Sequence, residues 1–404
     1  MTEGGRAGSS GRGRTRLRDA LVIAEVAVAM VLLVGAGLLF ASFTSLVRSD
    51  PGFRPEQVVA VTVSVSRTEF PDPLPRIAAF REMEERMAAL PGVTSVGSVS
   101  RLPLDADPLT TRVFVEGQTS VPDASLPEAQ LRTASAGYFR TMGIPLIRGR
   151  PFQENDSTFV VIVTRAFARD IVGADDPVGR RVKLGGSTAD EPWFTIIGVA
   201  GDVRDGAYRD APQPQVFRSS NQAPATTMNL VVRSSTPTEP LVAAMRRIAG
   251  ELAESAPVYD VRTMSGVVSR AQTAERFLTT LVGMFATLGL VLAAVGMYGV
   301  LANAVTERTR EIGIRMALGA QRVAVLREVV GRGLALTGIG LVAGAVLAAG
   351  ATRALSGVLY NVRPGDPRSF LAAMAVLIAV AAIAAWVPAR RASRVDPTVA
   401  LRAE

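Results

Sequence analysis

The sequence predicts an α-helical membrane protein with four transmembrane helices and a large extracytoplasmic α+β domain inserted between helices 1 and 2. Two observations carry this prediction. Four apolar stretches are long enough to cross a bilayer, which takes about 20 mostly apolar residues. The first and second of these stretches are separated by residues 47–275, which are polar and mixed in pattern. The composition agrees, since 48% of the 404 residues are hydrophobic and the mean hydropathy is positive.

The four predicted spans cover residues 20–46, 277–304, 333–352 and 369–389. Arginines precede the first span, as they do in a secretory signal. Its apolar region is longer than the about 7–15 residues that such signals use, so we predict a retained anchor. Residues 1–19 are rich in arginine and glycine, and we predict that they form a flexible segment.

The arginines beside the spans predict their orientation. Arginine-rich flanks precede span one, join spans two and three, and follow span four. The connection between spans three and four holds only Arg353, Arg363 and Arg368. Short loops rich in arginine stay in the cytoplasm. We therefore predict a multi-pass protein of the bacterial inner (cytoplasmic) membrane, with both termini cytoplasmic and residues 47–275 extracytoplasmic. These flanks also account for the pI of 10.7, and no nucleic acid is expected as a partner.

Two strand–helix–strand patterns open and close the segment between spans one and two. Alternating or apolar runs predict strands, and amphipathic runs between them predict helices. Between the two patterns lies a more β-rich stretch. We predict an α/β platform built from both ends of the domain, with an inserted β-rich subdomain. The predicted elements are Val59–Val65, Pro73–Leu90, Val93–Val99, Phe159–Val163, Phe194–Val199, Met228–Val232, Glu239–Leu252 and Val258–Val261.

Several kinds of chemistry are excluded by composition. The chain has no cysteine and no histidine, which removes disulfides, thiolate nucleophiles, imidazole ligands and histidine-based catalysis. No phosphate-binding P-loop motif occurs. We therefore predict no catalytic residue, cofactor or metal site, and no enzyme activity of the chain itself. Neighbouring carboxylates do not match the EF-hand spacing and indicate turns rather than calcium sites; they are Asp105, Asp107, Asp175, Asp176, Asp202 and Asp205.

Two features within the spans concern helix contacts. Glu25 is acidic and lies within span one. Carboxylates inside a membrane are often functional, but at about two turns from the arginine flank Glu25 also fits a snorkelling or interhelical contact. In span three, Gly340, Gly344 and Ala348 recur at steps of four. Such a stripe of small residues lets another helix approach closely, although it names no partner.

The cytoplasmic loop after span two is predicted to hold a short charged helix. Glu307 can pair with Arg310 at helical spacing. Glu311 can pair with Arg315 in the same way, and Gly319 can end the helix. A plain solvated connector is the alternative.

The residues of this loop resemble the signature of MacB/FtsX-type ABC transporter permeases, a TEREIG-like run followed by R-x-A-L-G-A. Residues 388–402, 138–150 and 175–179 are similar to the same family, and the resemblance covers nearly everything from Leu17 onward. It is closest to the second half of duplicated orphan permeases of this family. A solitary unit and one half of such a duplicated permease are both open.

The resemblance implies a permease subunit that takes its ABC ATPase in trans. It implies a MacB-like core domain over residues 47–275, an FtsX-like permease domain over residues 276–404, and a coupling helix over residues 306–320 seated on the ATPase. ATP hydrolysis would then move the extracytoplasmic domain, by mechanotransmission, for efflux or release of a substrate. The residues assigned to the coupling helix are Glu307, Arg310, Glu311, Ile312, Gly313, Arg315, Ala317, Gly319 and Ala320.

The implied partners are membrane lipid, a second permease in a homodimer or beside a paralogue, and a periplasmic adaptor in the case of efflux. Two other functions remain open: a membrane regulator of an extracytoplasmic enzyme, and a scaffold without an ATPase. We also predict that Thr263–Ala304 is largely one helix of about 63 Å, a plausible rigid transmitter of motion.

Overall fold

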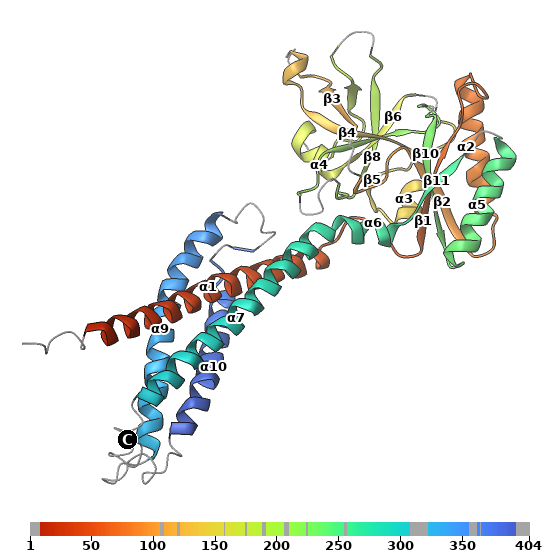
Figure 1. Cartoon of the computed structure of the whole chain (residues 1–404). Helices are drawn as coiled ribbons and strands as arrows, with labels where there is room; N and C mark the ends of the chain where they lie inside the picture. The colour runs from red at the N-terminus through yellow and green to blue at the C-terminus, as the bar shows by residue number, and fades with distance from the viewer. Residues whose placement is uncertain are drawn as a thin grey trace, which may run out of the picture. The chain divides into compact units, whose positions relative to one another are not determined.

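The chain divides into two compact units, which are drawn in Figure 1. A helical unit comprises Met1–Arg48 with Ala274–Glu404, and an outer domain comprises Ser49–Thr273. The computed structural model describes residues 9–105, 109–118, 122–156, 158–173, 176–187, 191–205, 210–223, 225–253, 257–307, 322–354, 362–363 and 365–392.

Among these described residues, four helices of the helical unit are long and apolar enough to cross a membrane. They are α1 (Ser9–Arg48), α7 (Thr273–Glu307), α9 (Arg322–Ala354) and α10 (Pro367–Ala392). Each contains one of the four predicted apolar stretches. Helix α1 begins at Ser9, within residues 1–19, for which we predicted a flexible segment, and from Ser9 onward this segment is helical. Arginine is a good helix former, and the helix of the span extends readily into an arginine-rich flank.

The outer domain has a platform made from its two ends, as predicted. Its strands lie in the order β11 (Val258–Thr263), β1 (Val58–Ser64), β10 (Thr227–Ser234) and β2 (Val93–Val99), with antiparallel neighbours. The strands of the two strand–helix–strand units therefore interleave. The connecting helices α2 (Pro73–Ala88) and α5 (Thr238–Leu252) pack side by side and share one core with β1 and β10 (Figure 1).

The inserted β-rich subdomain is a closed ring of strands. The pairing runs from β4 through β3, β7, β8, β6 and β9 back to β4, the last step being a parallel pairing of Gln130–Ala134 with Gln215–Ser219. Apolar side chains from these strands form one buried cluster. The strands are β3 (Thr110–Val115), β4 (Glu128–Ala134), β6 (Val160–Thr164), β7 (Arg181–Leu184), β8 (Phe194–Ala200) and β9 (Gln215–Ser219), and β5 (Leu146–Gly149) adds to β8.

Short helices complete the outer domain. They are α3 (Tyr138–Met142), α4 (Arg165–Phe167), a π-helical turn (Ala168–Val172), a 3-10 turn (Asp123–Ser125) and α6 (Met264–Ala271). Two glycines let α3 begin directly on β2. A Cβ atom at Gly97 would lie 2.4 Å from the Tyr138 nitrogen, and one at Gly137 would lie 2.1 Å from the Val96 oxygen. Tyr138 is fully buried and packs on Phe217 of β9, so α3 joins the platform to the ring of strands.

The prediction of one long helix over Thr263–Ala304 is wrong. Helix α6 ends at Ala271, and the backbone turns at Gln272, where φ is −94° and ψ is −2°. The Gln272 N–H donates a hydrogen bond to the carbonyl of Ser269, three residues earlier, rather than to a carbonyl four residues earlier as in an α-helix. Such a tighter turn is common at helix ends. No glycine or proline marks this break in the sequence. Helix α7 alone, with 35 residues, is about 52 Å long.

Candidate functional site

Helix α9 lies directly on α1 through the predicted stripe of small residues. A Cβ atom at Gly340 would lie 2.7 Å from the Cβ of Val26, and one at Gly344 would lie 2.7 Å from the Cβ of Met30. Only glycine fits at such a separation. Ala348, the third member of the stripe, is buried in the same bundle core. Since the contacts advance together along both helices, α1 and α9 run parallel.

Helix α7 meets α1 at a second set of glycines, in the opposite direction. A Cβ atom at Gly289 would lie 3.2 Å from Leu32, whereas one at Gly296 would lie 1.9 Å from the Glu25 carboxylate. Glu25 Oε2 is shielded from solvent and has no hydrogen-bond partner among the described residues. The carboxyl of Glu25 is therefore an interhelical contact, as one of the two interpretations of the sequence held, and it is packed against a glycine.

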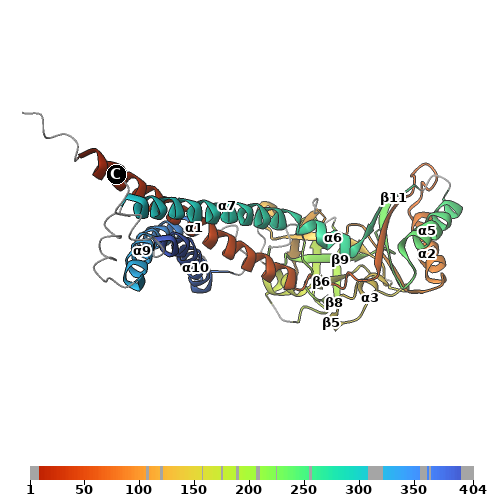
Figure 2. The same ribbon diagram turned by 60° about the horizontal axis from the view of Figure 1, so that its bottom comes forward.

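One end of the bundle gathers the arginine-rich flanks. Gly333, near the start of α9, lies beside Leu301 of α7 and Ala385 of α10. The beginnings of α1 and α9 and the ends of α7 and α10 therefore share one end, and the views of Figures 1 and 2 agree with this arrangement. At that end Arg332 of α9 bonds Asp19 of α1 at 3.1 Å. The described parts of flanks that are far apart in the sequence thus lie at one end of the bundle.

The predicted coupling helix falls mostly outside the described residues. Glu307 is the last residue of α7, and α9 begins at Arg322, so the loop between them starts and ends at the arginine-rich end of the bundle. The contact with an ATPase stays a prediction. The coupling residues that lie outside the described part are Arg310, Glu311, Ile312, Gly313, Arg315, Ala317, Gly319 and Ala320.

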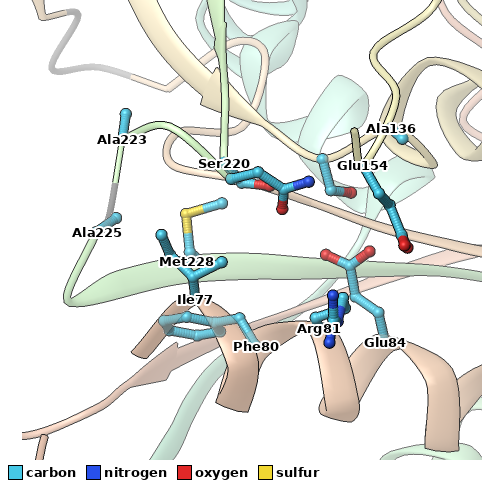
Figure 3. A pocket seen from close by; sticks show the side chains of 12 residues that line it. Ile77, Phe80, Arg81, Glu84, Ala136, Glu154, Ser220, Ala223, Ala225 and Met228 are labelled. Carbon is cyan, nitrogen blue, oxygen red and sulfur yellow. The ribbon is translucent and has the colours of Figure 1, made fainter. Parts of the chain in front are cut away.

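In the outer domain, a small cavity of about 70 Å³ contains an acidic group that sequence reasoning missed. Glu84 of α2 and Glu154 point toward each other across it, beside Arg81 (Figure 3). Burial raises the pKa of Glu84 to about 7, and the nearby Ser98 and Ser135 hydroxyls oppose this shift only in part. The sequence held a signal for this site, because Glu84 follows Phe80 by one helical turn on the buried side of α2.

Two of the carboxylates assigned to turns, Asp202 and Asp205, have more specific roles, whereas Asp107 and Asp175 lie outside the described residues. Asp205 forms an ion pair with Arg132 of β4, and both side chains are nearly completely buried. Asp205 also accepts a hydrogen bond from the Leu104 nitrogen, so it ties two segments to the sheet. Asp202 accepts from the Ala166 nitrogen at the start of α4. Within the described residues, no group of three or more acidic side chains could hold a metal ion.

Comparison with known proteins places the whole arrangement in a family. The family model of the MacB-like periplasmic core domain matches residues 20–248, which is more than half of the chain, and that of the FtsX-like permease C-terminal region matches residues 283–397. The chain is a MacB/FtsX-type ABC transporter permease. The core match runs from α1 into α5, and the second match covers most of α7 and all of α9 and α10.

Named relatives of this permease are longer proteins. It is 28% identical to the macrolide export ATP-binding/permease protein MacB of Hahella chejuensis, over 66% of the chain and 42% of the relative. It is 25% identical to the MacB of Agrobacterium fabrum, over 77% of the chain and 50% of the relative. It is 26% identical to the pyoverdine export ATP-binding/permease protein PvdT of Pseudomonas savastanoi pv. phaseolicola, over 64% of the chain and 40% of the relative. The permease thus spans half or less of each relative's length.

Proposed function

We propose that this permease is the membrane subunit of an exporter in which a separate ABC ATPase drives motion of the outer domain. The observation that carries the proposal is the common end of the bundle, where α7 ends and α9 begins on either side of the family's signature loop. The relatives' names join an ATP-binding part to a permease. A second protein would supply that part here.

The basic end of the bundle supports an orientation. Because arginine-rich short flanks stay in the cytoplasm, this end would face the cytoplasm together with both termini, and residues 47–275 would lie outside the inner membrane. The chain leaves the helical unit after Arg48 and returns to it at Ala274, so α1 and α7 are the two connections to the outer domain. Motion imposed on the loop between α7 and α9 would reach the outer domain through them.

The outward surface of α7 supports the remaining partners. Its large apolar side chains are mostly exposed, including Phe285, Leu288, Leu292 and Val295. In a bilayer such a face contacts lipid or another apolar helix. We place membrane lipid and a second permease copy, identical or paralogous, against this face.

Exchange of a charge pair tests the coupling. In the variant Glu311→Arg with Arg315→Glu, the exchange inverts the charge pattern that the predicted coupling helix presents to the ATPase. We therefore expect the loss of ATPase capture in a pull-down and of substrate-dependent ATP hydrolysis, whereas membrane insertion is kept. The matched control is Glu82→Arg with Arg86→Glu, which exchanges an exposed pair of the same spacing and order in α2. Full ATPase capture and activity in the Glu311/Arg315 variant would refute the assigned role.

Cysteine labelling tests the orientation, because the chain has no cysteine of its own. Thr68→Cys, at an exposed position of the outer domain, should react with an impermeant maleimide once only the outer envelope is opened. Thr306→Cys, exposed near the end of α7, should react only after the inner membrane is permeabilised. The reverse pattern would overturn the proposed orientation.

A further inference from the structure

A polar groove with a volume of about 780 Å³ lies where the platform of the outer domain meets the ring of strands. Platform strands β1, β10 and β11 form one side of it, and β4 and β9 form the other. The volume is within the range of about 300–1,000 Å³ that is usual for small-molecule sites. The charged side chains that line it are Arg67, Arg101, Arg218, Arg262, Asp105 and Asp260, four cations against two anions.

Among the charged groups of the groove, Arg218 has the surroundings that most favour binding of an anion. It lies on β9 opposite Thr133 of β4, and its guanidinium is partly buried. Its Nε atom is shielded from solvent and has no hydrogen-bond partner among the described residues, and no carboxylate there forms an ion pair with it. Burial lowers the pKa of Arg218, and the charge of Glu191 opposes that effect only in part. An arginine stays protonated in proteins, so a cation is partly desolvated without a bonded anion.

The other arginines of the groove differ in their attachments. Arg262 is held by Asp260, with its Nε donating to Oδ1 at 2.7 Å. Arg101 and Asp105 each have other interactions. Arg67 is exposed on the loop after β1 and forms no ion pair within the described part of the chain. Arg67 and Arg218 are therefore the groove cations that offer a charge to a solute.

The neutral polar groups of the floor are already bonded to one another. The Thr62 hydroxyl donates to Asn229 Oδ1 at 2.8 Å, and Asn229 Nδ2 donates to the carbonyls of Val99 and Ser100 at 3.3 and 3.1 Å. These bonds make the floor a rigid surface with satisfied amides. Recognition in the groove therefore falls to the guanidinium groups, whose planar fork matches carboxylate and phosphate oxygens.

We propose that this groove binds a small solute carrying carboxylate or phosphate groups, with Arg218 as the anchoring cation and Arg67 as a second contact at the rim. Tyr259, which is 46% exposed, gives the same rim an aromatic surface. The site belongs to the outer domain and needs no ATPase. It can therefore fail while the coupling proposed above holds, and the reverse is also true.

Titration of the full chain in detergent micelles tests the site. Citrate and inorganic phosphate are the two probes, each added at constant ionic strength and followed by isothermal titration calorimetry. We expect saturable binding of at least one probe, and at least about tenfold weaker binding in Arg218→Gln, since a charge-assisted fork is lost. Arg218→Lys keeps the charge but loses the fork, so it should bind with intermediate strength. Binding of citrate alone assigns a carboxylate ligand, and binding of phosphate alone a phosphate ligand.

A control outside the groove and a second groove variant show whether a loss of binding is specific to the groove arginines. Arg148→Gln removes an exposed arginine that pairs with Asp176 outside the groove, and it should leave binding unchanged. If Arg218→Gln does not fold, the exposed Arg67→Gln replaces it, with an expected loss of about threefold or more. No saturable binding of either probe, or equal binding in the Arg218 or Arg67 variant and the Arg148 control, would overturn the proposal.

Discussion

Replacing Glu84 by glutamine should stabilise the outer domain at neutral and alkaline pH. Burial raises the pKa of this carboxyl from an ordinary 4.5 to about 7 in the folded chain. Between these two pH values the folded chain holds more protons at this position than the unfolded chain, so stability falls as pH rises through the window. At about 1.4 kcal/mol per unit of pKa, the cost carried above pH 7 reaches about 3 kcal/mol. Glutamine cannot ionise and avoids this cost.

Thermal unfolding measures the effect directly. The chain has two tryptophans, Trp193 in the outer domain and Trp386 in α10, so a Trp386→Phe background makes fluorescence report the outer domain alone. For a domain of this size, about 3 kcal/mol corresponds to a rise in Tm of roughly 6–12 °C. We expect Glu84→Gln to show that rise at pH 8 and nearly none at pH 4.5.

Glu128→Gln, at an exposed position of β4, is the matched control and should change Tm little at any pH. A Glu84→Gln variant that is equally or less stable than the parent at pH 8 would refute the reasoning. It would mean that the Ser98 and Ser135 hydroxyls outweigh burial and hold the carboxylate in its charged form.

Two further predictions concern buried contacts. Arg132→Met removes the guanidinium that forms an ion pair with the buried Asp205 carboxylate, so urea unfolding of the outer domain should show a loss of about 3–5 kcal/mol, most of it recovered when Asp205→Leu is added; an Arg132→Met variant as stable as the parent would contradict this. Gly344→Leu would drive a side chain into α1, so we expect a lower Tm of the helical unit and aggregation in size-exclusion chromatography, whereas Gly350→Leu, where a Cβ atom meets nothing within 4 Å, should behave like the parent; equal behaviour of the two variants would contradict the close packing.

The sequence predicted those parts of the fold that rest on periodicity. The four apolar helices follow from the length of uninterrupted apolar runs, and the platform follows from alternation in Val59–Val65 and amphipathic spacing in Pro73–Leu90. The ring of strands was foreseen only as a β-rich insertion. Its closure depends on the parallel pairing of β4 with β9, two strands far apart in the chain, which no local pattern encodes.

The contacts of individual side chains were the least predictable. The stripe at Gly340 and Gly344 was visible, but that α1 occupies it is a fact of tertiary packing. Asp205 belongs to a segment with turn-like composition, and its partner Arg132 lies 73 residues away. The groove around Arg218 gathers side chains from five strands, so its charge balance emerges only when the sheet is assembled.

The interleaved platform has a mechanical consequence. The chain enters the outer domain after Arg48 on its way to β1 and leaves it from β11 through α6, and Val59 pairs with Thr263 where these two strands meet. A difference in displacement between the two connections would load this pair of strands in the unzipping direction, in which hydrogen bonds yield one after another. The register shift between Ala60 and Thr62 interrupts the series of residue pairs between β1 and β11. If the two connections moved unequally, edge strand β11 would be peeled from β1 one hydrogen bond at a time, so this joint would resist force best when both connections move together.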